Sequence, residues 1–161
     1  MITQIQGKLV EKNPTQVVVD CNGIGYEINI SLFTFSSLSS DENIKLFTHL
    51  QVREDAHILY GFFTVLERAV FRLLISVSGI GSSTARTMLS SLTPAEIQHA
   101  IGTEDVATIQ GVKGIGLKTA QRLIIELKDK IKILQGTDEI PVLKSNTIKE
   151  ETLSALEVLG Y

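Results

Sequence analysis

Residues 79–85 read Gly-Ile-Gly-Ser-Ser-Thr-Ala and residues 114–120 read Gly-Ile-Gly-Leu-Lys-Thr-Ala, and this repeat decides the fold of the second half of the chain. The second copy follows the first by 35 residues, and apolar positions on either side recur at the same offset. In each copy two glycines interrupt an apolar helical periodicity, which resumes directly after them. The internal repeat therefore predicts two helix-hairpin-helix units.

The beginning of the second helix in each unit is a candidate anion site. Its first backbone N–H groups lack partners within the helix and lie at the positive end of the helix dipole, and glycine lets a ligand approach closely. Two such sites predict a surface that binds two phosphate groups; the alternative is that both glycine turns only join packed helices. The candidate phosphate-binding residues are Gly79, Gly81, Ser82, Ser83, Thr84, Gly114, Gly116, Leu117, Lys118, Thr119 and Arg122.

Two familiar nucleotide-binding motifs do not fit these glycines. A P-loop requires glycine directly before its Lys-Thr pair, where this chain has Leu117, and its first glycine would fall at Val112. The dinucleotide fingerprint requires a third glycine at Thr84 or Thr119, after a strand rather than a helix. The sequence disfavours nucleotide binding, and we expect no cofactor, no metal site and no catalytic residue.

Composition narrows the class of protein further. The formal net charge is −3, but residues 111–134 contain six lysines or arginines and two acidic residues, a local net charge of +4. No apolar run has the length of a membrane span, and the first residues alternate in polarity instead of forming a signal peptide. The single cysteine, Cys21, excludes an intrachain disulfide framework. We expect a cytoplasmic protein with no membrane partner.

Residues 1–62 have the alternating pattern of short β-strands. The predicted strands cover residues 2–10, 16–21, 25–30, 44–53 and 56–62. Asn22-Gly23 is a strong two-residue hairpin signal, and a serine-rich stretch at residues 36–40 leads to the fourth strand. Five short strands predict a closed or nearly closed barrel of the OB type, and the helices that follow it make the fold α+β.

Glu54 and Asp55 are adjacent between the last two predicted strands, where a hairpin must turn. They have three interpretations: a solvated turn, part of a metal-dependent nuclease with His49 and His57 nearby, or a fixed negative charge that repels phosphates and keeps a DNA path open. The spacing of the histidines on opposed strands gives no convincing metal-ligand set.

Helix-start signals divide the rest of the chain. Thr64 with Glu67, and Thr93 with Glu96, predict capping boxes at the beginnings of two helices. The expected domains are the barrel at residues 1–63, a tandem helix-hairpin-helix domain at 64–135, a flexible linker at 136–146 and the first helix of an incomplete C-terminal module at 147–161.

The whole chain resembles one known family. The resemblance rests on Arg-Glu-Asp-Ala at residues 53–56, Leu-Tyr-Gly-Phe at 59–62, Leu-Lys-Asp-Lys at 127–130 and Ala-Leu-Glu-Val-Leu-Gly-Tyr at 155–161, together with the barrel and both hairpins. This combination is similar to RuvA, the Holliday-junction-binding subunit of the bacterial branch-migration complex.

The resemblance implies a homotetramer, or an octamer of two tetramers, that holds a four-way DNA junction open in recombination and repair. It implies that hexameric RuvB ATPases bind the C-terminal domain, that RuvC resolves the junction, and that ATP and Mg²⁺ belong to the motor. By resemblance Glu54 and Asp55 form an acidic pin at the junction centre, and the two hairpins contact phosphates. The alternatives remain a structure-selective nuclease and a protein-interaction adaptor without catalysis.

Two features depart from the family pattern. Ser82-Ser83 stands where Pro-Lys is usual, and Leu117 stands where a basic residue is frequent. We therefore expect weaker and less salt-sensitive DNA binding than in a form with lysine in both hairpins. The C-terminal module of the family has three helices, of which only the first is expected here, so recruitment of the motor by this chain is in question.

Overall fold

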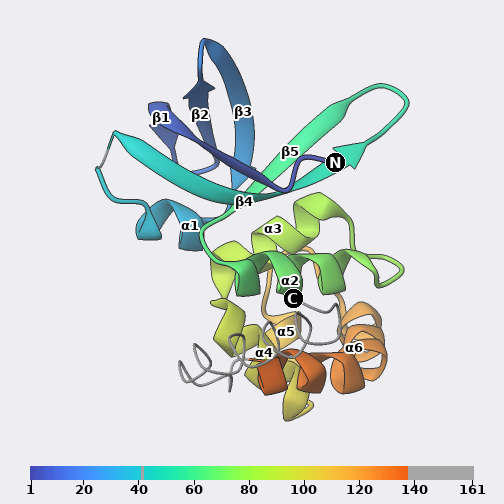
Figure 1. Cartoon of the computed structure of the whole chain (residues 1–161). Coiled ribbons are helices and arrows are strands. Elements are labelled where there is room, and N and C mark those ends of the chain that lie inside the picture. The colour runs from blue at the N-terminus through green and yellow to red at the C-terminus, as the bar shows by residue number, and fades with distance from the viewer. Residues whose placement is uncertain (41, 138–161) are drawn as a thin grey trace, which may run out of the picture.

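The computed structural model describes residues 1–40 and 42–137, in which a small β-barrel is followed by a group of helices (Figure 1). The barrel strands are β1 (Gln4–Asn13), β2 (Gln16–Cys21), β3 (Ile24–Ile30), β4 (Asn43–Val52) and β5 (His57–Phe62). They close in the order β1-β2-β3-β5-β4, and only the β3–β5 pair is parallel. The predicted five-stranded barrel of the OB type is confirmed.

The strand alternation places one face of each strand in the barrel interior. The buried interior side chains are Ile5, Val17, Val19, Ile28, Ile30, Leu38, Ile44, Leu46 and Leu59. Asn22 and Gly23 join β2 to β3 with φ values of 54° and 91°, the left-handed geometry of a two-residue hairpin turn. The Asn-Gly prediction is therefore confirmed.

A short helix that the sequence pattern does not predict, α1 (Leu32–Ser37), lies between β3 and β4. Ser31 caps it, since its hydroxyl accepts a hydrogen bond from the Thr34 amide at 3.1 Å. The helix is too short to show a periodic stripe, and the serines that follow are typical of loops. It lies next to the first turn of α2, where Thr34 donates a hydrogen bond to Glu67.

The helical half contains α2 (Val65–Ile75), α3 (Ser82–Ser91), α4 (Pro94–Gly102), α5 (Val106–Gln110) and α6 (Leu117–Thr137). Their apolar faces form one core, which includes Phe71, Leu74, Met88, Leu89, Ile97, Ile101, Ile109, Leu123, Leu127 and Ile131. Helix α6 continues beyond Gln135, its expected end, so Gly136 is helical. The rest of the predicted linker and the helix expected at residues 147–161 lie outside the described residues. Within the described part of the chain, no helix is long and apolar enough to cross a membrane.

Of the two predicted capping boxes inside the described residues, one is confirmed and one is wrong. Thr93 and Glu96 exchange both hydrogen bonds at the beginning of α4. Thr64 caps α2 by accepting from the Glu67 amide at 3.0 Å, but the Glu67 carboxylate does not return a bond to the Thr64 amide. It bonds instead to α1 and to the Phe63 amide. Hydrogen bonds to residues distant in the sequence have thus taken the place of the expected bond with the Thr64 amide.

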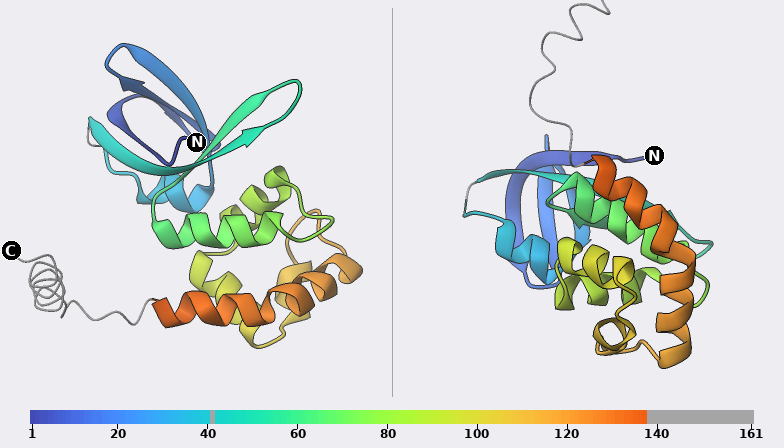
Figure 2. Two further views of the ribbon diagram at one scale, coloured as in Figure 1. Left: turned by 45° about the vertical axis from the view of Figure 1, so that its right-hand side comes forward. Right: turned by 90° about the horizontal axis from the view of Figure 1, so that it is seen from below.

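The barrel lies against the helical half (Figure 2), and aromatic side chains pack between them. The Phe71 ring of α2 lies 4.8 Å from the Phe62 ring and 5.1 Å from the Tyr60 ring, centroid to centroid. Tyr60 and Phe62 are strand residues, yet they belong to the core of the helical half. The two halves of the described chain are therefore in direct contact.

Candidate nucleic-acid interface

The first hairpin joins α2 to α3 through residues 76–81. Gly79 has a φ of 94°, a backbone conformation that residues with a Cβ rarely adopt, so glycine is required there for the turn itself. The buried Ile80 side chain anchors the loop in the core, and its amide donates to the Val77 carbonyl at 3.1 Å. Helix α3 then begins with Gly81 as its N-cap, and no side chain caps it.

The second hairpin repeats this geometry between α5 and α6. Gly114 has a φ of 90°, Ile115 is buried, and the Ile115 amide donates to the Val112 carbonyl at 3.2 Å. The first turn of each second helix is also equivalent, since the amides of Ala85 and Ala120 donate to the carbonyls of Gly81 and Gly116, both at 2.9 Å. The sequence repeat is thus a structural repeat, and both predicted helix-hairpin-helix units are confirmed.

Gly81 and Gly116 differ from the turn glycines because the fold of the subunit does not require them. Gly81 has an ordinary extended conformation, with a φ of −86°. A Cβ added at either glycine would meet no atom within 4 Å, so neither position is restricted by packing. Both residues are exposed and precede helix N-termini whose first amides have no partner within the helix. The free space leaves the backbone open to a ligand.

The other candidate phosphate-binding residues are not equally accessible. Ser83, Leu117 and Lys118 are exposed, and Thr84 and Thr119 are half-buried. Ser82 is only 2% exposed, whereas its counterpart Leu117 is 49% exposed. The Ser82 side chain is therefore largely shielded from solvent, and the phosphate contact expected of this residue stays a prediction.

Arg122 connects the two hairpins. It lies on α6, one turn after Lys118, and its Nη1 atom donates to the Ser78 carbonyl of the first hairpin at 3.5 Å. Its guanidinium group remains exposed and has further donors that this single bond does not use. Arg122 thus extends from α6 to the first hairpin and places a positive charge beside it.

The basic stretch at residues 111–134 does not act as one surface. Lys128 forms an ion pair with Glu104, in the turn between α4 and α5, and this pair raises the pKa of Lys128 and lowers that of Glu104. It is also ten residues beyond Lys118, or about 15 Å along the helix. The cations near the hairpins are therefore Lys113, Lys118 and Arg122, and the charge of the later lysines lies farther along α6.

Glu54 and Asp55 form the tip of the β4–β5 hairpin. The Arg53 amide donates to the Ala56 carbonyl at 2.8 Å, which closes a two-residue turn, and both carboxylates are exposed. In the left view of Figure 2 this tip and the loops that precede α3 and α6 extend toward the same side, on the right. A ligand on that side meets the two candidate phosphate-binding turns and the acidic tip.

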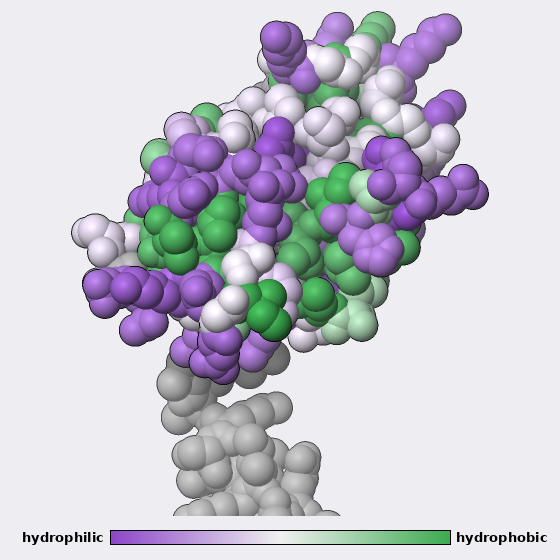
Figure 3. All heavy atoms as spheres, turned by 90° about the horizontal axis from the view of Figure 1, so that it is seen from above, coloured by the Kyte–Doolittle hydropathy of each residue, from purple (hydrophilic) through white to green (hydrophobic). Residues whose placement is uncertain are grey.

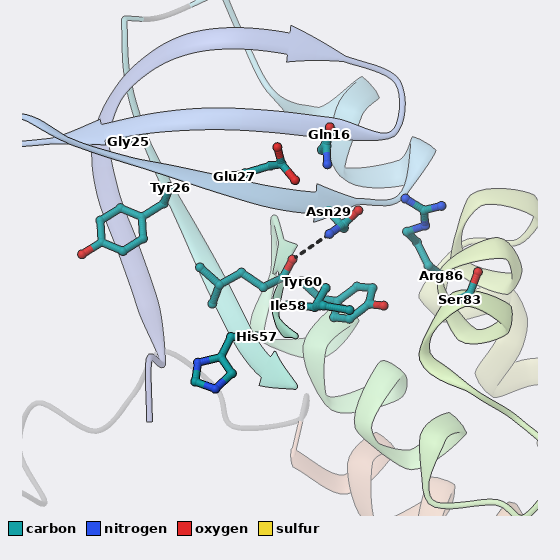
Figure 4. Close-up of a pocket in the computed structure, with 11 residues that line it drawn as sticks. Gln16, Gly25, Tyr26, Glu27, Asn29, His57, Ile58, Tyr60, Ser83 and Arg86 are labelled. Atoms are coloured by element: carbon teal, nitrogen blue, oxygen red, sulfur yellow. Dashed lines mark hydrogen bonds between the residues drawn. The ribbon is translucent and has the colours of Figure 1, made fainter. Parts of the chain in front are cut away.

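A groove of about 530 Å³ lies between the barrel and α3 (Figure 4). Ser83 and Arg86 line it from the helix, and His57, which follows the acidic turn, lines it from β5. Arg86 is held in place by a 3.2 Å bond from its Nη1 atom to the Thr15 carbonyl. The groove therefore extends from the first turn of α3 to the beginning of β5, next to the acidic turn, and polar side chains line it.

The residues considered for a nuclease site are not brought together. His49 pairs with Tyr60 in the β4–β5 ladder, away from the acidic tip, and its Nδ1 atom accepts from Arg72 at 3.4 Å. Burial and the nearby Arg72 and Arg68 lower the pKa of His49. In residues 1–40 and 42–137 no three His, Cys, Asp or Glu side chains are grouped so that they could hold a metal ion.

A barrel with an acidic hairpin, joined to paired hairpins whose helix N-termini are open, defines a tandem helix-hairpin-helix DNA-binding protein. Residues 1–61 match the family model described as the RuvA N terminal domain, and residues 71–129 match the SAM-like helix-hairpin-helix tandem. The chain belongs to the RuvA family.

Several curated relatives are similar over the whole chain, and each is named Holliday junction branch migration complex subunit RuvA. The relative from Christiangramia forsetii is 64% identical over 161 residues, which cover 100% of this chain and 83% of the relative. The relative from Flavobacterium psychrophilum is 60% identical with the same coverage. The relative from Cytophaga hutchinsonii is 52% identical over 166 aligned residues, with 100% of this chain and 83% of the relative covered.

Proposed function

We propose that this chain binds four-way DNA junctions by their shape and holds them open for ATP-driven branch migration by a separate motor, in recombination and repair. The observation that carries the proposal is the common orientation of the two glycine hairpins and the acidic hairpin. Family membership supports it, because the relatives are named as subunits of the Holliday junction branch migration complex.

The hairpins suit a protein that must bind DNA of any sequence. Backbone amides at Gly81 and Gly116, with Lys118 and Arg122, can contact phosphate oxygens, which are the same in every nucleotide. Nothing in such contacts reads base edges. The specificity must therefore come from the spatial arrangement of several phosphate-binding hairpins, which a branched DNA satisfies and a straight duplex does not.

The acidic hairpin contributes repulsion instead of attraction. Two unit charges 4 Å apart interact by about 1 kcal/mol in water, so each phosphate that approaches Glu54 or Asp55 meets a penalty of that order. This repulsion destabilises binding of DNA that crosses the tip, and it does not affect DNA whose strands diverge around the tip. Glu54 and Asp55 therefore favour an open junction centre over a continuous duplex.

The remaining partners follow from the family. We propose that the chain assembles as a homotetramer or an octamer, that RuvB hexamers act as the motor, and that RuvC resolves the junction. A subunit without a motor agrees with Leu117 at the position where a P-loop has glycine. Exposed apolar side chains on the barrel strands, including Val10, Ile24 and Val52, are available for packing between subunits. Figure 3 shows hydrophobic areas among hydrophilic ones on the barrel end of the molecule.

The test compares binding to a synthetic four-way junction with binding to a linear duplex of the same sequences, by fluorescence anisotropy at fixed salt. We expect the junction to bind more tightly, and we expect the preference to persist when the sequences of all four arms are changed. Equal affinity for both DNAs would refute shape recognition. Incubation of a labelled junction with the protein and Mg²⁺ belongs to the same experiment, because cleavage would favour the nuclease alternative.

A further inference from the structure

Glu67 is a carboxylate in the interior of the protein without a positive partner. It is 0% exposed, and no lysine or arginine of the described residues forms an ion pair with it. Its Oε1 atom accepts from Ser31 Oγ, and its Oε2 atom accepts from Thr34 Oγ1 at 2.6 Å and from the Phe63 amide at 3.0 Å. Burial of a carboxylate is costly unless such donors surround it.

These donors come from different parts of the fold. Ser31 and Thr34 belong to α1 and its cap, which connect two barrel strands, whereas Glu67 lies in the first turn of α2, which leads to the first hairpin. Thr34 Oγ1 also accepts from the Phe63 amide at 3.0 Å, so the groups form one closed network. The network therefore ties the barrel to the helical half where the chain passes between them.

Glu96 shows that this arrangement is not ordinary helix capping. It has the same position relative to Thr93 that Glu67 has relative to Thr64, three residues after the N-cap. Its carboxylate is exposed and accepts a 2.7 Å hydrogen bond from the Thr93 amide. The Glu67 carboxylate forgoes this local bond and reaches α1, 33 and 36 residues away in the sequence.

Besides the Glu67 network, the two halves are joined by aromatic packing and by exposed hydrogen bonds, such as those from Arg68 to the Thr3 carbonyl and from Arg86 to the Thr15 carbonyl. The exposed bonds compete with water, so they constrain the orientation less than a buried network does. Phe71 packs against Tyr60 and Phe62, and hydrophobic packing is largely non-directional, so such a surface permits small rotations. A satisfied buried polar network has angular requirements and selects one arrangement. The acidic tip belongs to the barrel and the glycine hairpins belong to the helical half, so their separation depends on that orientation.

We propose that Glu67 is a positioning residue that fixes the acidic hairpin relative to the phosphate-binding hairpins and thereby sets the preference for branched DNA. The inference rests on the proposed function and adds the residue that determines its specificity. Glu67 touches no DNA in this mechanism; it acts through the orientation of the barrel.

The first experiment measures the ratio of junction affinity to duplex affinity in the wild type, Glu67→Gln and Glu96→Gln. Glutamine presents an NH₂ group to a set of donors, which breaks part of the network with little change in volume. We expect Glu67→Gln to lower the ratio at least about fivefold, the lower range of typical coupling between sites. The matched control Glu96→Gln removes a carboxylate at the same helical position and should leave the ratio unchanged.

The second experiment separates positioning from loss of stability. Spin labels at Arg53→Cys, next to the acidic tip, and Gln121→Cys, on α6, in a Cys21→Ser background and diluted with unlabelled protein report the distance between the two halves within one subunit. We expect Glu67→Gln to broaden this distance distribution or to shift it, and the control Glu96→Gln to preserve it. Unchanged distances overturn the proposal, even where the affinity ratio falls.

Two further outcomes remain interpretable. If Glu67→Gln does not fold, Ser31→Ala removes the donor to Oε1 together with the side-chain cap of α1, and it leaves the Thr34 and Phe63 bonds to Oε2. The same two measurements apply to it. If the wild type shows no junction preference, the proposed function is refuted. The distance measurement still decides whether Glu67 fixes the orientation of the barrel relative to the helical half.

Discussion

Replacement of Gly81 and Gly116 by alanine tests the interface most directly, because its effect on the stability of the subunit can be separated from its effect on DNA binding. An added Cβ meets no atom of the subunit within 4 Å at either position. Alanine is a poorer N-cap than glycine, which costs about 0.5–1 kcal/mol, and it reduces the entropy of the unfolded chain, which contributes about 0.4–1 kcal/mol. The two terms offset each other, and we expect Tm to move by no more than about 2 °C.

DNA binding should respond much more strongly to the same two substitutions. The new methyl group stands where a phosphate must approach the first amides of α3 and α6. Loss of one hydrogen bond to a charged group costs about 1.5–3 kcal/mol, which weakens junction binding about tenfold to a hundredfold. Anisotropy titrations with a four-way junction measure the affinity, and thermal denaturation measures the stability. Affinity within about twofold of the wild type would show that DNA does not approach these glycines.

The comparison with Gly79 and Gly114 provides the control. Both turn glycines have φ near 90°, where a side chain adds about 1–2 kcal/mol of strain. Their alanine variants should lose stability as well as affinity. Only the pair at the helix N-termini should lose affinity alone, because only there is the glycine needed by the ligand and not by the turn.

Three further predictions concern charge. Lys118→Ala should weaken binding to all DNA sequences alike and reduce the salt dependence of the affinity by about one ion for each phosphate that the lysine neutralises. In the control Lys128→Ala, whose lysine pairs with Glu104, the affinity measured by titrations at several salt concentrations should stay unchanged. Joint replacement of Glu54 and Asp55 by Gln and Asn should tighten duplex binding and reduce the junction preference; an unchanged preference in competition titrations would contradict the pin. Burial raises the pKa of Glu67. The free energy of unfolding of the wild type, relative to that of Glu67→Gln, should therefore fall as the pH rises from the ordinary glutamate pKa to the raised one. Urea unfolding from about pH 4 to about pH 8 measures this difference, and a difference that does not change with pH would contradict the prediction.

The sequence determined the parts of this protein whose causes are local. Gly79 and Gly114 require glycine because of a turn that spans a few residues, and Asn22-Gly23 fixes its hairpin in the same way. Strand alternation and helical stripes depend only on the period of the chain. The α+β fold, the barrel and both helix-hairpin-helix units could therefore be predicted, and so could Gly81 and Gly116 as candidate binding residues.

Only the tertiary structure decided what depends on residues distant in the sequence. Ser82 and Leu117 occupy equivalent positions in the repeat, yet one is buried and the other is exposed. Lys128 belongs to a basic stretch but is paired with Glu104 in the turn between α4 and α5. The same Thr-x-x-Glu pattern produces a local capping box at Glu96 and a long-range network at Glu67, because only Glu67 has hydroxyl groups from another helix within reach. Periodicity predicts which face of an element is buried, but the partner that lies against that face is set by how the whole chain packs.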